Sequence, residues 1–260
     1  LAVTNRVGMN NIASFAYQND AAGRRTRRID NAGVTNTFGY NPRSELIEAF
    51  MGANVFGYVY DPIGNRIIST NNATVYRYTA NALNQYTSIT NGGVQSLYYD
   101  FDGNLTNDGT LAHGWDGENR LASVEDKSSG QKKNWRKYQF VYHYLSRRIQ
   151  KQAYKWSNPN KTWETTPFEE ARFIYDGWNL IREISTTGVT NQYILGLDLS
   201  QSLQGAGGIG GLLCVIRNGT PYYPCYDANG NITDYVNTNG VVVAHREYDP
   251  FGRPTTLTGP

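Results

Sequence analysis

The stretch YVYDPIGNRI, residues 58–67, contains the unit on which the fold depends. Tyr58 and Tyr60 are two positions apart, so in a β-strand their side chains lie on the same face. Asp61 and Gly64 take the first and fourth positions of a type I turn with proline at the second, and an aspartate there can accept backbone N–H bonds. Glycine also permits the positive φ that a hairpin exit often needs. The stretch predicts a strand, a tight turn and an antiparallel return strand.

The same unit recurs along the whole chain, with further clear copies at residues 226–233 and 248–253. The first six copies follow one another at intervals of about twenty residues, which is within the range of repeat folds. The second aromatic residue of successive copies is Tyr17, Tyr40, Tyr60, Tyr78, Tyr99, Trp115, Tyr142, Tyr175, Tyr226 and Tyr248. The turn positions that follow the aromatic residues include Asp61, Gly64, Asp100, Gly103, Asp116, Asp176, Asp227, Gly230, Asp249 and Gly252.

The repeat predicts an all-β fold in which tandem hairpins form a curved or spiralled antiparallel sheet. Aromatic residues form a ladder on one face, where cross-strand pairs contribute about 0.2–1 kcal/mol each. We expect a single array over residues 1–260, with regular repeats at 1–125, longer hairpins with insertions at 126–192 and a last segment at 193–260. The alternative is an ordinary β-sandwich with scattered tyrosines. It does not explain why the turn residues recur at the same place after the aromatic residues.

Composition excludes several function classes. The chain has 260 residues and a net charge of +2, so its charge indicates neither a nucleic-acid-binding protein nor one for acidic substrates. Two cysteines are too few for a disulfide scaffold. No stretch approaches the roughly 20 apolar residues of a membrane span. The start, at Leu1, shows no signal peptide, and we interpret the chain as a processed piece of a longer protein.

The units resemble the YD repeats of the RHS family, which includes bacterial RHS proteins, the BC cocoon of Tc toxins and the YD shell of teneurins. Residues 193–213 resemble the approach to the RHS-associated core, and residues 225–253 resemble the last repeats before that core closes. The resemblance implies a hollow β-shell around a toxic or folded C-terminal cargo, in a secreted or cell-surface bacterial protein. The family's self-cleaving aspartate lies further downstream, so no residue here takes that role.

We therefore expect a non-enzymatic structural segment of such a shell, or a short relative with a different use. Its partners would be the remainder of the parent RHS protein and its cargo, and exposed sheet edges would favour self-association. No catalytic, cofactor or metal site is expected.

A glycine-rich stretch, residues 205–210, matches the dinucleotide pattern G-x-G-x-x-G. That pattern requires a following helix, whereas residues 212–217 read as a strand that leads into the hairpin signal Asn218-Gly219. This turn would place Arg217 opposite Thr220 and the two cysteines, Cys214 and Cys225, on a diagonal. The stretch is expected to be a connection, and the cysteines either free buried thiols or, with a bulge at Pro224, a disulfide.

Other candidate sites can also be explained as purely structural elements. Residues 100–104 resemble a calcium loop but also match the repeat's own turn, and His113, His143 and His245 lack ligand-spaced neighbours for zinc. Residues 127–155 combine basic and aromatic side chains, as expected either for nucleic-acid binding or for a long hairpin with a packed aromatic face and a solvated basic face.

Two alternatives to a shell remain. Trp135, Trp156, Trp163 and Trp178 would favour a glycan-binding surface if they lined one groove. Glu169-Glu170, or a pair of turn aspartates, would suit a hydrolase if two carboxylates faced each other across a cleft.

Overall fold

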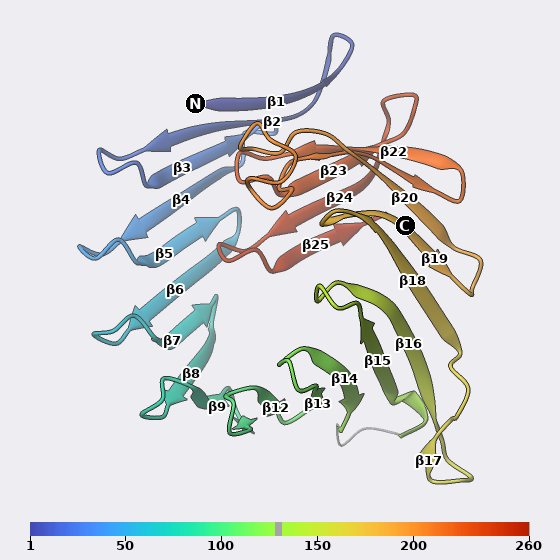
Figure 1. Ribbon diagram of the computed structural model, residues 1–260. Coiled ribbons are helices and arrows are strands. Elements are labelled where there is room, and N and C mark those ends of the chain that lie inside the picture. The colour runs from blue at the N-terminus through green and yellow to red at the C-terminus, as the bar shows by residue number, and fades with distance from the viewer. Residues whose placement is uncertain (128–131, 260) are drawn as a thin grey trace. The chain divides into compact units, whose positions relative to one another are not determined.

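The computed structural model describes residues 1–127 and 132–259 (Figure 1). Within these residues every regular element is a β-strand except the short 3-10 helix η1 (Lys132–Asn134). The strands form two antiparallel sheets, of ten and fifteen strands among the described residues, in which neighbours in the chain are neighbours in the sheet. The all-β, antiparallel expectation is confirmed. Residues 128–131 and 260, which fall inside the predicted repeat ranges, lie outside the description.

One compact unit comprises residues 1–75 and 192–260. Its N-terminal strands are β1 (Ala2–Val7), β2 (Asn10–Asn19), β3 (Arg25–Asp30), β4 (Thr35–Tyr40), β5 (Leu46–Met51), β6 (Asn54–Tyr60) and β7 (Arg66–Asn71). Its C-terminal strands are β21 (Leu212–Arg217), β22 (Thr220–Tyr226), β23 (Ile232–Val236), β24 (Val242–Tyr248) and β25 (Pro254–Thr258). Two strands, β8 (Thr74–Ala80) and β20 (Thr190–Leu195), run across the limits of this unit.

The second compact unit comprises residues 76–191. Its strands are β9 (Tyr86–Thr90), β10 (Val94–Ser96), β11 (Tyr98–Tyr99), β12 (Leu105–Asn107), β13 (Leu111–Trp115), β14 (Leu121–Asp126), β15 (Arg136–Tyr142), β16 (Arg148–Ser157), β17 (Thr162–Trp163), β18 (Glu169–Asp176) and β19 (Asn179–Ser185). The short strand β17 pairs with β16 beside the main path of the sheet.

The aromatic residues of the first repeats lie on one buried face. Phe38 pairs with Ala49, and Ala49 pairs with Phe56, so these side chains form one row across β4, β5 and β6. Phe15 and Tyr17, two positions apart on β2, are both buried. The two buried clusters of this unit both lie on the face that the i, i+2 spacing predicts.

The hairpin turn has one design, seen in full at Asp61. The N–H of Gly64 donates to the carbonyl of Asp61, and the N–H of Asp61 donates to the carbonyl of Asn65. The Asp61 carboxylate accepts the backbone N–H groups of Ile63 and Asn65 at 3.0 and 2.8 Å. Gly64 has a φ of +94°. This is a three-residue loop, a type I turn followed by a left-handed residue that forms a bulge.

The same four bonds recur at many turns. The residue that takes the Asp61 position is Asp20, Asp30, Asn41, Asn81, Asp100, Asp116, Asp227, Asn237 and Asp249. Asp176 differs, because it pairs directly with Asn179 across a two-residue turn. Aspartate and asparagine serve equally because the turn needs only a short side-chain oxygen.

Candidate functional site

In most repeats a side-chain donor joins the hairpin to the preceding one. The Tyr60 hydroxyl donates to the carbonyl of Leu46 at 3.0 Å, and Leu46 is the first residue of the neighbouring return strand β5. The bonds of the same kind are Tyr40 to Arg25, Tyr99 to Tyr86, Trp115 to Leu105, Tyr142 to Leu121, Tyr175 to Arg148, Tyr226 to Leu212 and Tyr248 to Ile232. In each bond the acceptor is the first residue of a return strand. We call these bonds the hairpin bridges.

Burial favours the protonated form of several of the bridging hydroxyls. Burial raises the pKa of Tyr40, Tyr99 and Tyr175 above the ordinary phenol value and raises that of Tyr226 to about 12. A protonated phenol can donate a hydrogen bond, so these hydroxyls can form their bridges. The repeat positions predicted from the sequence thus include the donor of every hairpin bridge.

The first hairpin of the chain contacts the last repeats, within the unit of residues 1–75 and 192–260. Asn5 on β1 accepts the N–H of Tyr226 at 3.0 Å and donates to its carbonyl at 2.9 Å. The Tyr17 hydroxyl accepts the N–H of Ala228 at 2.9 Å. Figure 1 shows β1 and β2 beside β22 and β23. Tyr17 therefore bonds a C-terminal turn rather than an earlier strand.

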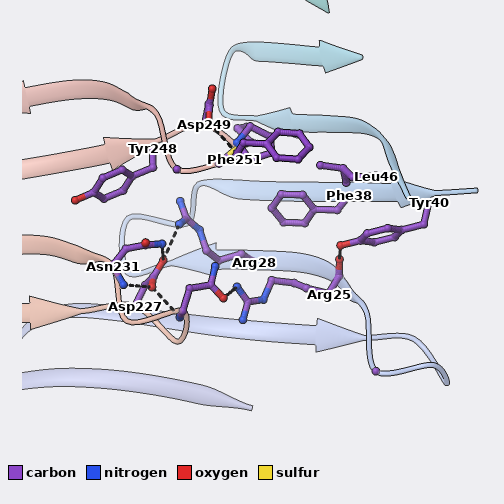
Figure 2. A pocket seen from close by; sticks show the side chains of 15 residues that line it. Arg25, Arg28, Phe38, Tyr40, Leu46, Asp227, Asn231, Tyr248, Asp249 and Phe251 are labelled. Carbon is purple, nitrogen blue, oxygen red and sulfur yellow. Dashed lines mark hydrogen bonds and ion pairs between the residues drawn. The ribbon is translucent and has the colours of Figure 1, made fainter. Parts of the chain in front are cut away.

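A cavity of about 570 Å³ lies where the C-terminal turns cover the aromatic face of β3 to β5 (Figure 2). Phe251, at the tip of the 249–252 turn, packs edge-on against Tyr58 with ring centroids 4.9 Å apart. The lining residues are Gly23, Arg25, Arg28, Phe38, Tyr40, Leu46, Met51, Asp227, Asn229, Asn231, Tyr248, Asp249, Pro250, Phe251 and Gly252. Several of these residues are turn or aromatic positions predicted from the sequence, whereas the two arginines were not predicted.

The two arginines form the charged end of this cavity. Arg28 lies 3.8 Å from a carboxylate oxygen of Asp227, and Arg25 donates to the side chain of Asn229 at 2.8 Å. The Arg25 guanidinium also lies over the Tyr17 ring, 4.1 Å from its centroid. Asp227 is almost fully buried, and its two oxygens accept three hydrogen bonds within its own turn, from Asn229 and Asn231.

The glycine-rich stretch is an ordered loop built around Asp198. This buried carboxylate accepts N–H groups of Ser200, Ala206 and Gly208 at 2.9, 2.7 and 3.1 Å. The Ser200 hydroxyl and these backbone bonds lower the pKa of Asp198 to about 2. Strand β21 follows the loop, as the sequence predicted, so the helix that a dinucleotide site requires is replaced by a strand.

The cysteines occupy the predicted hairpin, where Arg217 pairs with Thr220. Cys214 and Cys225 are both buried and both free. Burial, together with the charge of the nearby Asp234, raises the pKa of Cys225 to about 11. A thiol with so high a pKa is a poor nucleophile at neutral pH.

The candidate metal sites are structural. The carboxylate of Asp100 accepts the N–H groups of Asp102 and Asn104, so the calcium-like segment is a repeat turn. His245 contacts Asp234 at 2.8 Å, while His143 lies in a turn and His113 lies 4.0 Å from Asp108. Over residues 1–127 and 132–259, no group of three His, Cys, Asp or Glu side chains is placed to hold a metal ion. The same residues include no helix long and apolar enough to cross a membrane.

The acidic pair Glu169-Glu170 does not form a catalytic dyad. The two residues are consecutive on β18, so their side chains lie on opposite faces. Hydrogen bonds from Arg172 and Gln152 lower the pKa of Glu170, whereas a general acid for glycoside hydrolysis needs a raised pKa. At Asp61 the side-chain amide of Asn65 and the turn N–H groups lower the carboxyl pKa in the same direction.

The expected separation of basic and aromatic faces in residues 127–155 is wrong. Phe140 pairs with Lys151 across β15 and β16, so the two side chains share a face. Lys151 lies 5.0 Å from the Tyr138 ring centroid, and Arg148 lies 5.2 Å from that of Phe140. Cation–π packing allows both kinds of residue on one side of the hairpin. Ser128 to Gln131 of this stretch lie outside the described residues.

The tryptophans do not line one groove. Trp135, Trp156 and Trp163 pack on one another, with ring centroids 5.4, 6.4 and 5.3 Å apart. The Trp163 indole also donates to Glu125 at 3.0 Å. Trp178 instead lies exposed in the turn between β18 and β19. Three of the four rings are thus largely used in packing.

Comparison with known proteins supports the repeat assignment. The family model described as RHS Repeat matches residues 226–260. The tRNA3(Ser)-specific nuclease WapA of Bacillus spizizenii is 29% identical over 224 residues, which are 83% of this chain and 8% of that protein. The tRNA nuclease WapA of Bacillus subtilis strain 168 matches with the same identity and coverage.

A solved structure of TcdB2-TccC3-Cdc42 matches 96% of this chain and 17% of its own, with 15% identity and a TM-score of 0.39. This chain spans 8% of the length of the curated relatives named above. The resemblance to the RHS/YD-repeat family is confirmed by the family model and these relatives.

Proposed function

We propose that this array of RHS repeats is a non-enzymatic wall segment of a β-shell, in a secreted or cell-surface bacterial protein, that encloses or presents a toxin or other cargo domain. The relatives named as nucleases are many times longer than this chain, so the region that it matches is a small part of them. The cargo and the rest of the parent protein would be its partners.

The hairpin bridges are the observation that carries this proposal. Each bridge joins a hairpin to the preceding one through the same pair of positions, in both compact units. Contacts that depend only on the adjacent copy allow an array to be extended by adding copies, as in other repeat proteins. Hydrogen bonds lower the carboxyl pKa of Asp61, Asp100 and Asp198, as expected of structural rather than acid-base residues.

The test uses the full parent polypeptide and limited proteolysis. One version carries a specific protease site in the exposed turn at Trp178, and a second carries the same site within the segment that follows residue 260. We expect rapid cleavage at the turn and at least tenfold slower cleavage of the downstream segment, because an enclosed segment is sterically shielded. Equal cleavage rates at the two sites in the folded protein would contradict enclosure.

A further inference from the structure

We propose that the cavity on the aromatic face of β3 to β5 binds a carboxylate carried on an aromatic or aliphatic body. Its volume of about 570 Å³ is within the range of small-molecule and side-chain pockets. All of its lining residues belong to the unit of residues 1–75 and 192–260.

One side of the cavity is apolar. Figure 2 shows the rings of Phe38 and Phe251, with Leu46, on one side of Arg28. Phe251 remains 53% exposed although it packs on Tyr58, so part of its ring is available to a ligand. A ring or alkyl chain placed here would leave water for an apolar surface, which favours binding.

The other side presents guanidinium donors. The Nε atoms of Arg25 and Arg28 are buried and have no hydrogen-bond partner among the described residues. The nearest carboxylate oxygen to Arg28, on Asp227, lies at 3.8 Å, which is beyond hydrogen-bond length. A buried donor without a partner is costly, and a planar guanidinium matches a carboxylate in geometry. A carboxylate bound in the cavity would lie beside both guanidinium groups, which line it.

The two acidic residues of the lining do not suit a cationic ligand. The oxygens of Asp227 accept three bonds within its turn, and Asp249 accepts the N–H groups of Phe251 and Arg253. Asp227 thus uses most of its acceptor capacity, and Asp249 accepts both of its bonds on one oxygen. The Nε donors of Arg25 and Arg28 have no partner among the described residues, and these unpaired cationic donors favour an anion.

The experiment titrates the intact chain with N-acetyl-phenylalanine and with its neutral amide, followed by calorimetry or NMR. We expect the carboxylate to bind at least about tenfold more tightly than the amide, because a hydrogen bond to a charged group is strong. Arg28→Gln should remove this preference. Arg27→Gln is the matched control, because Arg27 lies on the same strand but on the opposite face, where it pairs with Gln18 and Thr37.

A second variant is used if circular dichroism shows that Arg28→Gln is poorly folded. Asn229→Asp places a carboxylate against Arg25, which already donates to the side chain at position 229. This variant should bind the carboxylate probe at least about fivefold more weakly and should bind the amide with unchanged affinity. The proposal is overturned if the carboxylate and the amide bind equally to the wild type, or if neither binds at 10-fold molar excess over millimolar protein.

Discussion

At the residue scale, the second aromatic of each repeat has two tasks. Its ring packs on the face shared by i and i+2 side chains, and in most repeats its polar atom donates to the carbonyl of the first residue of the neighbouring return strand. A phenylalanine would keep the first task and lose the second. This explains why tyrosine far outnumbers phenylalanine in the chain, with 20 copies against 9.

Tyr226→Phe tests the energy of one bridge. The Tyr226 hydroxyl lies 2.6 Å from the carbonyl of Leu212, so its removal leaves a part-buried acceptor without this donor. We expect a loss of about 1 kcal/mol in the free energy of unfolding, measured by chemical denaturation. The control Tyr223→Phe changes a more exposed tyrosine on the same strand and should stay within about 0.5 kcal/mol. Equal losses would contradict a bridge at Tyr226.

His245 predicts a dependence of stability on pH. Burial alone would lower the pKa of His245, but the hydrogen bond and charge of Asp234, with Glu247, raise it above the ordinary value of 6.5. The folded state therefore binds the proton more tightly than the unfolded state, so this stabilisation is complete below about pH 6.5. It is lost as the pH rises through the raised pKa.

The measurement is the free energy of unfolding between pH 5 and 8, compared with that of His245→Gln. The wild type should lose stability relative to the variant as the pH rises, and Asp234→Asn should weaken that trend while keeping a side-chain acceptor at 234. If the plots of unfolding free energy against pH are parallel for the wild type and His245→Gln, the His245–Asp234 pair does not contribute the expected pH dependence.

At the element scale, the turn with Asp or Asn first and a left-handed residue fourth sets the hairpin geometry. At the fourth position Gly230 has a φ of +78° and Gly252 a φ of +85°. The surroundings of the two glycines differ. A Cβ on Gly230 would lie 2.5 Å from a methyl carbon of Ile209, in the glycine-rich loop, whereas a Cβ on Gly252 meets nothing within 4 Å.

Gly230→Ala and Gly252→Ala separate backbone strain from packing. Gly252→Ala should cost about 1–2 kcal/mol, because an alanine is strained in the left-handed region. Gly230→Ala carries the same strain and should lose at least about 1 kcal/mol more through overlap with Ile209. Chemical denaturation measures both. If the two variants lose equal stability, the glycine-rich loop does not pack tightly against Gly230.

Much of the hairpin pattern could be predicted from the sequence, since the turn bonds are local. The identical turns at Asp30, Asn81 and Asn237 were not predicted, because none of these residues directly follows an aromatic residue. The signal was present: each of these residues is followed three positions later by Gly33, Asn84 or Gly240 with positive φ.

Neither the bridge acceptors nor the cavity could be predicted. A backbone carbonyl has no signature in the sequence, and the one that Tyr60 reaches depends on the register of the neighbouring hairpin. Arg25 and Asn229 are 204 positions apart, so their contact depends on how the C-terminal turns fold onto the first strands. Local chemistry does not specify that packing.

At the scale of the molecule, the unit of residues 1–75 and 192–260 joins the first hairpin to the last repeats. The contact is specific, because the side-chain amide of Asn5 both donates to and accepts from the backbone of Tyr226, as a backbone amide in a sheet would. The Tyr17 hydroxyl adds a third bond, to Ala228. The first strands of this unit are therefore held by residues from the opposite end of the sequence.

Asn5→Ala tests this contact. It removes both bonds to the Tyr226 backbone, so we expect hydrogen exchange of β1 and β22 amides to accelerate by about tenfold or more, equivalent to at least ~1 kcal/mol. Asn10→Ala, an exposed position on the same hairpin, is the control and should leave these amides unchanged. If both variants exchange alike, Asn5 does not hold the first strand in place.

The hairpin bridges also bear on how such a chain can evolve. The bond from Tyr175 to Arg148 spans 27 positions, whereas that from Tyr60 to Leu46 spans 14. The donor side chain bonds the first residue of a return strand in both cases. The number of residues between donor and acceptor can therefore differ from one repeat to the next. Lineages can therefore lengthen, shorten or rewrite the intervening loops while the stacking is preserved, and divergence between relatives should concentrate there.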